Sequence, residues 1–588
     1  MSTWHVRPSG GSYGDEDGTS YENAWDGLSN ITWGTGGVVA GDTLYIYGVH
    51  YEVLQIGASG SAGSKIRIVF VDGAQLWPSV SLSSFTQVST SEIYKLATSS
   101  GIYQVWEDGV LLNPEAHSAD TESTIQGALD RGDYTNKASP QTLYLRCSDG
   151  AAPSTHSLRG TDRGNDSSPG VIDTNDKSYL VIENPSVRGG QWNSTYACGV
   201  YIQSGTSITV KGLHAQDCRY GAVIRGGTNI RVDEFTLLDT IGTGVYVDAS
   251  NADLTNCYIT KGRVERVCRM ARYDSIDLQF ALDGDGVGVG HAGGTITNLV
   301  LTDNVFVDCG PQYALDADIP ADVTNSPDVD RGAGFFLGSS SAMDVFGLTL
   351  ERNVFQDGHR YGALFGNEVK GDVRIVGNMF LRTGNAPEYG VAALYLNGTE
   401  NADANWTVYN NGFVDNVQRT SLTMVSMESV DTLANVNNLF QDNDKSSDAA
   451  ALSWRGDIWR SSFVSPAGDT ESYNTHDTRG DLQSAVLYRE AAQDYTTLSA
   501  YQTATSRGTG TTNEATNARS DGRLNGSSPA VGTGLKWWTG ESPRGADGRR
   551  FMSPPSRGAY EYYGGGIAGV IPPRVKPAGA DIAKARAA

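Results

Sequence analysis

The sequence predicts an all-β solenoid, specifically a parallel β-helix, from two repeats and their spacing. Strand-like runs that begin with glycine start 22 and 23 residues apart at Gly199, Gly221 and Gly244. Later members begin at Gly286, Gly334, Gly362 and Gly390. A second series, Asn-x-Phe, runs in step at Asn304, Asn353, Asn378, Asn411 and Asn438. A period of roughly 20–30 residues with Gly and Asn turns indicates a solenoid whose turns each carry about three short strands.

Rival repeat folds and several function classes fit the sequence poorly. The Leu-x-x-Leu-x-Leu spacing of leucine-rich repeats is absent, and a propeller blade needs a longer unit of roughly 40–45 residues. The formal net charge of −23 disfavours binding to nucleic acid or to anionic lipid, since both require a basic surface. No run of about 18 apolar residues occurs, so we expect no membrane span.

The cysteine pattern and the N-terminal residues indicate the compartment in which the chain is synthesised. No CxxC pair occurs, so we expect buried free thiols and no structural zinc. Residues 1–8 have neither a basic nor an apolar segment, so we expect synthesis in the cytosol without a signal peptide. The six cysteines are Cys147, Cys198, Cys218, Cys257, Cys268 and Cys309.

The first two predicted regions are a cap with the first coils, residues 1–82, and an inserted β-rich subdomain, residues 83–165. In the cap, the capping-box spacing of Thr19 and Glu22 predicts one short helix near residues 20–28. Alternating or continuous apolar residues predict strands at 41–48 and 65–70. In the insertion, Asp108-Gly109 predicts a hairpin turn, and residues 142–147 read as a strand.

The remaining regions are the main β-helix and its closure. Residues 166–445 carry the repeat and form the solenoid. Residues 446–563 leave the repeat and are expected to close it with strands and a helix from Leu482 to about Tyr501. Residues 564–588 are expected to be a flexible tail or a docking peptide.

Parallel stacking places residues of equal phase above one another, so the repeat predicts a polar and aromatic stripe along one edge. Tyrosine rings can pack on sugar faces while charged groups bind hydroxyls, which suits a neutral or mildly charged glycan. The alternative is that turns are polar without binding anything. Arg225 and Asp248 fall just after the repeated strand. The predicted substrate-binding residues are Tyr220, Tyr361, Tyr389, Arg360, His359, Glu368, Glu388 and Arg331.

Asp-x-Asp pairs supply candidate catalytic groups, because residues i and i+2 of an extended chain face the same side. Paired carboxylates can act as acid and base on a glycosidic bond or bind Ca²⁺, and the alternative is a solvated acidic loop. The pair Asp283 and Asp285, with His291 close in sequence, ranks first as the catalytic group, and Asp316 with Asp318 ranks second. A third pair is Asp328 and Asp330. No other cofactor or metal is expected.

A lyase would need a base and a cation facing a uronate carboxylate. Its candidates are His359, Arg360, Tyr361 and Lys370. The charge of −23 would repel a polyuronate, so the residues favour a hydrolase over a lyase.

Motifs at both ends of the chain carry a family resemblance. Residues 6–10, 17–20, 41–43 and 59–66, with Ala24-Trp25, resemble the N-terminal cap of right-handed parallel β-helix proteins of the pectate-lyase-like superfamily. Residues 498–502, 527–532 and 557–561 resemble the segment after their last coils. Members of this superfamily include polysaccharide lyases, glycoside hydrolases and phage tailspikes.

The resemblance, together with the missing signal, implies a phage tailspike-like protein. Such a protein would be a homotrimer of the virion tail, would contact other tail components, and would bind and hydrolyse a bacterial surface polysaccharide. Two alternatives remain open: a non-enzymatic structural virion or adhesion protein, and a polysaccharide lyase.

Overall fold

The computed structural model divides the chain into two compact units. The first contains Met1–Ile224, Leu237–Tyr246 and Val267–Asp283, and the second contains Arg225–Thr236, Val247–Arg266 and Gly284–Ala588. The structure describes most residues between 1 and 558. The residues outside the description are 100, 116–120, 139, 163–168, 191–196, 251, 268–283, 291–292, 311–331, 339–343, 359–360, 367–368, 385–391, 398–403, 415, 417–419, 426–431, 442–455, 461–469, 473, 478–487, 491–492, 496, 507–508, most of 514–548, 554 and 559–588.

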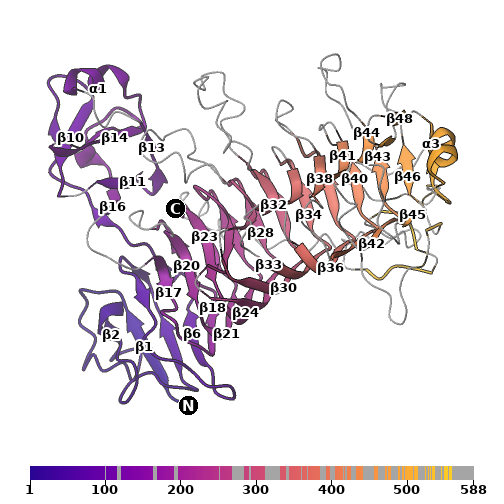
Figure 1. The fold of residues 1–588 in the computed structure, drawn as a ribbon. Helices are drawn as coiled ribbons and strands as arrows, with labels where there is room; N and C mark the ends of the chain where they lie inside the picture. Colours follow the sequence, from indigo (N-terminus) through magenta and orange to yellow (C-terminus); the bar gives the residue numbers. More distant parts are fainter. Residues whose placement is uncertain are drawn as a thin grey trace. The chain divides into compact units, whose positions relative to one another are not determined.

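Three parallel sheets build the first unit, and successive strands of the chain pass from one sheet to the next (Figure 1). The first sheet has the order β2 (Trp25–Asp26), β1 (Thr3–Arg7), β3 (Thr43–Ile46), β6 (Ile66–Phe70), β18 (Leu180–Glu183) and β21 (Thr206–Lys211). The second has the order β5 (Leu54–Gln55), β17 (Gly170–Asp173), β20 (Cys198–Gln203) and β23 (Tyr220–Arg225). The third has the order β4 (Val49–His50), β7 (Gln75–Leu76), β19 (Ser186–Arg188) and β22 (His214–Gln216).

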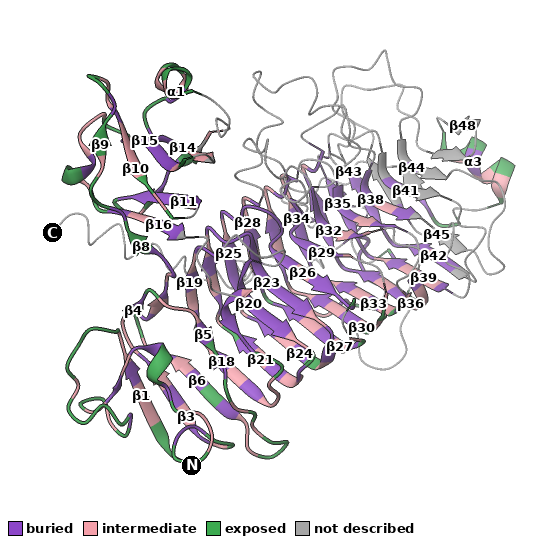
Figure 2. Cartoon of the chain, turned by 60° about the vertical axis from the view of Figure 1, so that its left-hand side comes forward, coloured by how far each residue is buried: buried purple, intermediate pink, exposed green. Residues whose placement is uncertain are grey.

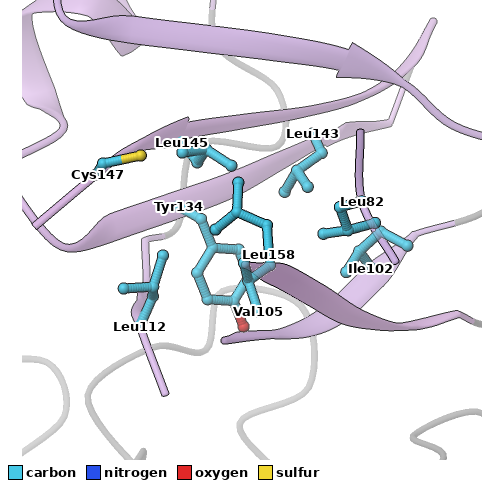
Figure 3. Close-up of a cluster of buried hydrophobic side chains, with 9 residues drawn as sticks. All are labelled: Leu82, Ile102, Val105, Leu112, Tyr134, Leu143, Leu145, Cys147 and Leu158. Atoms are coloured by element: carbon cyan, nitrogen blue, oxygen red, sulfur yellow. The ribbon is translucent and has the colours of Figure 1, made fainter. Parts of the chain in front are cut away.

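An inserted subdomain with two mainly antiparallel sheets lies in sequence between β7 and β17 of the first unit. Its core packs Tyr134 among aliphatic side chains from both sheets (Figure 3). One sheet has the order β13 (Asn113–Pro114), β14 (Asp133–Ala138), β15 (Gln141–Arg146), β10 (Ile93–Ala97) and β9 (Thr86–Gln87). The other has the order β12 (Val110–Leu111), β11 (Ile102–Glu107), β16 (Leu158–Asp162) and β8 (Val80–Ser81).

A buried carboxylate joins this insertion to the third sheet. Asp217, which follows β22, is fully buried, and its Oδ2 accepts a hydrogen bond from Trp106 Nε1 at 3.0 Å. The same oxygen accepts from Arg188 Nε at 3.0 Å and Nη2 at 2.9 Å. The insertion is therefore anchored to the first unit by a charge-assisted network as well as by the chain itself.

The second unit repeats the three-sheet arrangement. One sheet has the order β24 (Gly227–Asp233), β27 (Leu254–Thr260), β30 (Thr295–Thr302), β33 (Asp344–Glu351), β36 (Val369–Val376), β39 (Ala404–Tyr409), β42 (Thr432–Val436) and β45 (Thr470–Ser472). Another has the order β29 (Val287–Val289), β32 (Ala333–Leu337), β35 (Tyr361–Phe365), β38 (Ala392–Asn397), β41 (Thr420–Val425), β44 (Gly456–Arg460), β47 (Tyr488–Glu490) and β48 (Gln493–Tyr495). The third has the order β28 (Arg263–Glu265), β31 (Val305–Val307), β34 (Val354–Gln356), β37 (Met379–Leu381), β40 (Gly412–Val414), β43 (Leu439–Gln441), β46 (Thr475–Asp477) and β49 (Thr512–Asn513). The strands β25 (Thr236–Leu238) and β26 (Val245–Asp248) carry residues of both units. The predicted all-β parallel β-helix is confirmed.

Two ladders of identical side chains stabilise the second unit. The rings of Phe306, Phe355, Phe380, Phe413 and Phe440 stack with neighbouring centroids 4.9–5.1 Å apart. Asn304, Asn353, Asn378, Asn411 and Asn438 form a second ladder, in which each Oδ1 after the first accepts the backbone N–H and the side-chain N–H of the preceding asparagine. This is the vertical alignment that the Asn-x-Phe series predicts. The buried interior that the alternating side chains produce is coloured purple in Figure 2.

Both predicted helices are wrong as stated. Residues 20–28 contain no α-helix, because Thr19 bonds back to Asp17 Oδ1 instead of capping, and β2 and the 3₁₀ turn η1 (Leu28–Asn30) follow. The stretch that was expected to be helical from 482 to 501 contains β47 and β48. The helix there, α3 (Leu498–Thr505), begins after Thr497, whose side chain accepts from Ala500 N.

The insertion holds the other α-helix of the described residues, α1 (Glu122–Ala128), and a 3₁₀ turn, η2 (Pro153–Thr155). The predicted hairpin turn is confirmed: Asp108 and Gly109 have φ of 49° and 78° and connect β11 to β12. Free thiols are also confirmed for the five cysteines in the described residues, all of them buried. Within the same residues, no helix is long and apolar enough to cross a membrane.

Candidate glycan-binding surfaces

Most residues of the predicted stripe lie outside the described part of the chain. The structure describes Tyr220, Tyr361 and Asp285. The predicted residues outside the description are Asp283, His291, Asp316, Asp318, Arg331, His359, Arg360, Glu368, Glu388 and Tyr389, together with the pair Asp328 and Asp330.

The two described tyrosines are packed into the protein rather than presented to solvent. Tyr220 is 4% exposed and packs with Cys198, Tyr201 and Val223, and its ring centroid lies 5.3 Å from that of Tyr246. Tyr361 is 8% exposed and contacts Tyr395 edge-on at 6.0 Å. The expectation that these rings face a sugar is therefore corrected, because neighbouring side chains already cover them.

Asp285 is a buried carboxylate that orders backbone. It is 1% exposed, and its Oδ1 accepts hydrogen bonds from the N–H groups of Gly332 at 3.0 Å and Ala333 at 2.8 Å. These contacts hold the start of β32, a task that a structural carboxylate performs well. Its pairing with Asp283 falls outside the described residues, so the catalytic role of both stays a prediction.

Residues of equal phase in the repeat lie beside one another in one column but not in another. Arg225, the last residue of β23, and Asp248, the last residue of β26, form an ion pair with Nε 2.8 Å from Oδ2. In contrast, the register pairs Ala363 with Leu394, so the residue opposite Gly362 is Ala393 and not the predicted Gly390. The partner of Gly362 is thus 31 residues further along the chain rather than 28, and the same register places Ala392 opposite Tyr361.

A group of aromatic and basic side chains covers the outer face of β1 and β3. We call it the cap patch, and it consists of His5, Arg7, Tyr13, Tyr21, Tyr45 and Tyr47. The parallel register places His5 beside Tyr45. Because strand residues alternate between faces, Val6, Leu44 and Ile46 point inward and are fully buried, and the ring-bearing neighbours point outward.

The rings of the cap patch support one another. His5 stacks on Tyr45 at 5.5 Å and on Tyr47 at 5.9 Å between centroids. Tyr21, which is 43% exposed, meets Tyr47 edge-on at 4.9 Å. The Arg7 guanidinium lies 4.1 Å from the centroid of Tyr13 and 4.4 Å from that of Tyr21. These contacts hold large amphipathic side chains at the surface in a preorganised arrangement.

The cap patch is rich in hydrogen-bonding groups at modest charge. Burial lowers the pKa of His5, so its imidazole is neutral at neutral pH, and its Nδ1 lies 3.1 Å from Tyr47 Oη. Burial, and after it the neighbouring Tyr45 and Tyr21, raise the pKa of Tyr47, so its hydroxyl stays protonated. This combination suits a sugar ligand, because aromatic ring faces can pack on its C–H groups and the polar edges can hydrogen-bond its hydroxyls.

The cap patch was not predicted from the sequence, although part of its signal is present there. The pairs His5 with Arg7 and Tyr45 with Tyr47 share a face by alternation. Nothing in the sequence shows that β1 and β3 are adjacent, and the loop that carries Tyr13 and Tyr21 has no periodicity.

One group of side chains in the described residues has metal-ligand chemistry. It consists of Glu107, Cys147 and His156 in the inserted subdomain.

Comparisons with known proteins agree on the fold. The family described as the right-handed β-helix region matches residues 165–380. No curated protein matches the chain. The chain is thus a right-handed parallel β-helix, in agreement with the handedness that the resemblance implies.

Several solved structures resemble the chain at low identity. The structure of XylC with xylose is 10% identical, with a TM-score of 0.48 over 84% of this chain and 86% of that one. Pectate lyase Pel9A is 14% identical, with a TM-score of 0.43 over 96% of this chain and 97% of that one. A lacto-N-biosidase from Eubacterium ramulus is 12% identical, with a TM-score of 0.35 over 80% and 66% of the two chains. At these values the likenesses assign no reaction to this chain.

Proposed function

We propose that this protein binds a polysaccharide and that the cap patch is one of its sugar-binding surfaces. The observation that carries the proposal is the cluster of four tyrosines, a neutral histidine and an arginine on the outer face of β1 and β3. Aromatic side chains with polar tips give large contact area at little cost in conformational entropy, which favours recognition of a hydroxylated ligand.

The same sheet face suits a chain-like ligand. Beyond Tyr45 in the register lies Val69 of β6, and Glu183 of β18 follows it. Arg67 of β6 forms an ion pair with Glu183 at 2.7 Å, and its side chain is 51% exposed. Aromatic groups followed by exposed charged groups along one face can contact successive sugar units of an extended glycan.

Affinity electrophoresis of the full chain in gels containing bacterial capsular or O-antigen polysaccharide tests the proposal. We expect retardation by at least one polysaccharide, with binding about tenfold weaker for Tyr21→Ala or Tyr47→Ala, a loss of about 1.4 kcal/mol. The control is Tyr258→Ala, which removes an outward tyrosine of β27 that has Arg231 over its ring at 4.9 Å. Retardation that the cap variants leave unchanged, or that Tyr258→Ala abolishes equally, would contradict the assignment to the cap patch.

The proposal extends to cleavage of the bound glycan, as in a tailspike-like depolymerase. The Asp-x-Asp pairs at 283/285 and 316/318 motivate it, because paired carboxylates can act as acid and base on a glycosidic bond. Asp283 and the 316/318 pair are the candidates for these roles, since the buried Asp285 holds backbone N–H groups. Hydrolysis predicts new reducing ends that Asp283→Asn or Asp316→Asn abolishes while binding remains. Ultraviolet-absorbing unsaturated products would indicate a lyase instead, and the absence of products from every retained polysaccharide would indicate a non-enzymatic structural or adhesion protein.

A homotrimer located on a virion tail, in contact with other tail components, completes this proposal. The resemblance of the residues in the cap and after the last coils supports it. It predicts a particle in solution of three times the chain mass of 62.7 kDa, which light scattering measures directly. A monomer at all accessible concentrations would refute the trimer without affecting the binding proposal.

A further inference from the structure

Three segments of the inserted subdomain converge on one point. Glu107 is the last residue of β11, Cys147 directly follows β15, and His156 directly follows η2. Cys147 lies at the margin of the packed cluster next to Leu145 (Figure 3). Since β11 and β15 belong to different sheets, the convergence joins the two sheets of the insertion.

The ligand atoms of these three side chains lie within 4.8 Å of one another. Glu107 is 3% exposed, and its Oε2 accepts the Ser148 N–H at 2.9 Å. Its other oxygen, Oε1, is buried with no hydrogen-bond partner and is directed at the cluster, 3.1 Å from His156 Nδ1. Oε1 shares this nitrogen with Asp108 Oδ2, so a buried carboxylate oxygen has no hydrogen bond of its own, and a positively charged ligand would relieve that cost.

Two further carboxylates increase the negative charge around the imidazole. Asp108 Oδ2 lies 2.8 Å from His156 Nδ1, and Asp149 Oδ1 lies 3.2 Å from its Nε2. The backbone holds both carboxylates in place, because Asp108 Oδ1 accepts from Ser157 N at 2.8 Å and Asp149 Oδ1 accepts from Ala151 N at 2.7 Å. The nearby Arg131 forms an ion pair with Glu92, so its positive charge is not devoted to this cluster. Three carboxylates therefore face one imidazole, and a dication would offset part of their negative charge.

The donor types select the class of metal. Thiolate, imidazole and carboxylate together suit Zn²⁺ and its neighbours, whereas Ca²⁺ and Mg²⁺ prefer oxygen ligands alone. Binding of a zinc-class ion would displace the proton of the Cys147 thiol, because the thiolate is the form that ligates a metal.

We propose that the inserted subdomain binds a zinc-class transition-metal ion through Cys147 Sγ, His156 Nδ1 and Glu107 Oε1. The more exposed Asp108 lies where it can complete the coordination. The ion ties the end of β11 to the turn after β15 and to the segment that leads into β16. No structural zinc was predicted from the sequence, because it contains no closely spaced cysteines, whereas these ligands come from three separate segments.

The test uses the full chain without an affinity tag, stripped with a chelator and titrated with Co²⁺, a spectroscopic substitute for Zn²⁺. We expect one equivalent to bind, with a thiolate-to-cobalt charge-transfer band in the near ultraviolet that one equivalent of Zn²⁺ abolishes. Cys147→Ser removes this band, and His156→Ala weakens binding at least tenfold. Cys257→Ala, which alters a buried thiol of β27, leaves band and stoichiometry unchanged.

Folding of the variants is checked independently of metal. Circular dichroism of the metal-free variants should match that of the metal-free parent, and Zn²⁺ should raise the first thermal transition of the parent but not that of Cys147→Ser. If the parent binds no Co²⁺ or Zn²⁺, or if Cys147→Ser retains the same affinity and transition, the proposal is wrong and the cluster is a network of ion pairs around His156. None of these results depends on glycan binding.

Discussion

A Cβ atom on Gly334 would lie 2.3 Å from Cδ1 of Phe355, so this glycine and this ring occupy adjoining space in the core of the second unit. The same relationship recurs between Gly286 and Phe306 at 2.4 Å and between Gly362 and Phe380 at 2.4 Å. The glycine repeat and the Asn-x-Phe repeat are therefore the two sides of one packing contact. The phenylalanine ring from one sheet occupies the space that a side chain at the glycine of another sheet would need.

This contact predicts a coupled pair of substitutions. Gly334→Ala forces a methyl group into the Phe355 ring and should lower the free energy of unfolding by about 1–3 kcal/mol. In a Phe355→Leu background the same change should cost less, because the smaller side chain removes the 2.3 Å contact and leaves the 2.8 Å approach to the backbone oxygen of Gly362. Urea unfolding of the four proteins measures the coupling. Gly63→Ala serves as the control, since nothing lies within 4 Å of a Cβ there, and equal costs in both backgrounds would show that the contact is not limiting.

Loss of one amide from the asparagine ladder should lower the stability of the protein strongly. Asn378 Oδ1 accepts two hydrogen bonds from Asn353, and its Nδ2 donates to Leu350 O and Asn411 Oδ1. Asn378→Ala leaves buried backbone groups unsatisfied at about 1–3 kcal/mol each, so the urea midpoint should fall markedly. Asn405→Ala removes an amide of β39 that bonds the Asp372 carboxylate near the surface, and it should change the midpoint little. Similar losses for the two variants would mean that the ladder contributes no special stability.

We expect the inserted subdomain to lose stability in acid, because an ion-paired carboxylate there becomes protonated. Hydrogen bonds from Arg131 and Arg146 lower the pKa of Glu92 from 4.5 to about 2. A carboxyl whose folded pKa is depressed stabilises the fold above its unfolded pKa, and this contribution disappears as pH falls from 4.5 towards 2. Glu92→Gln should therefore melt lower than the parent at neutral pH, with the two melting curves converging near pH 2. A constant difference in melting temperature across that interval would assign the effect of the substitution to packing rather than to charge.

The sequence alone was sufficient for the architecture of the repeat. In a parallel stack each residue lies over its counterpart one coil away, so spacing in sequence becomes position in space. For that reason Asn353 lies over Asn378, and Arg225 pairs with Asp248, as their phases predict. The Asp108-Gly109 turn was equally readable, because a tight turn depends on local backbone conformation alone.

Only the tertiary structure decided where the register of the repeat changes and which side chains are in contact. The partner of Gly362 is Ala393 rather than Gly390, because the register of β35 and β38 sets this spacing and the recurrence of glycine does not. Strand pairing overrode the helical pattern before Tyr495, because hydrogen bonds to β44 and between β47 and β48 outweigh propensity. The burial of Tyr220, the cap patch and the approach of Cys147 to Glu107 all depend on contacts between segments distant in sequence, for which the chain carries no periodic signal.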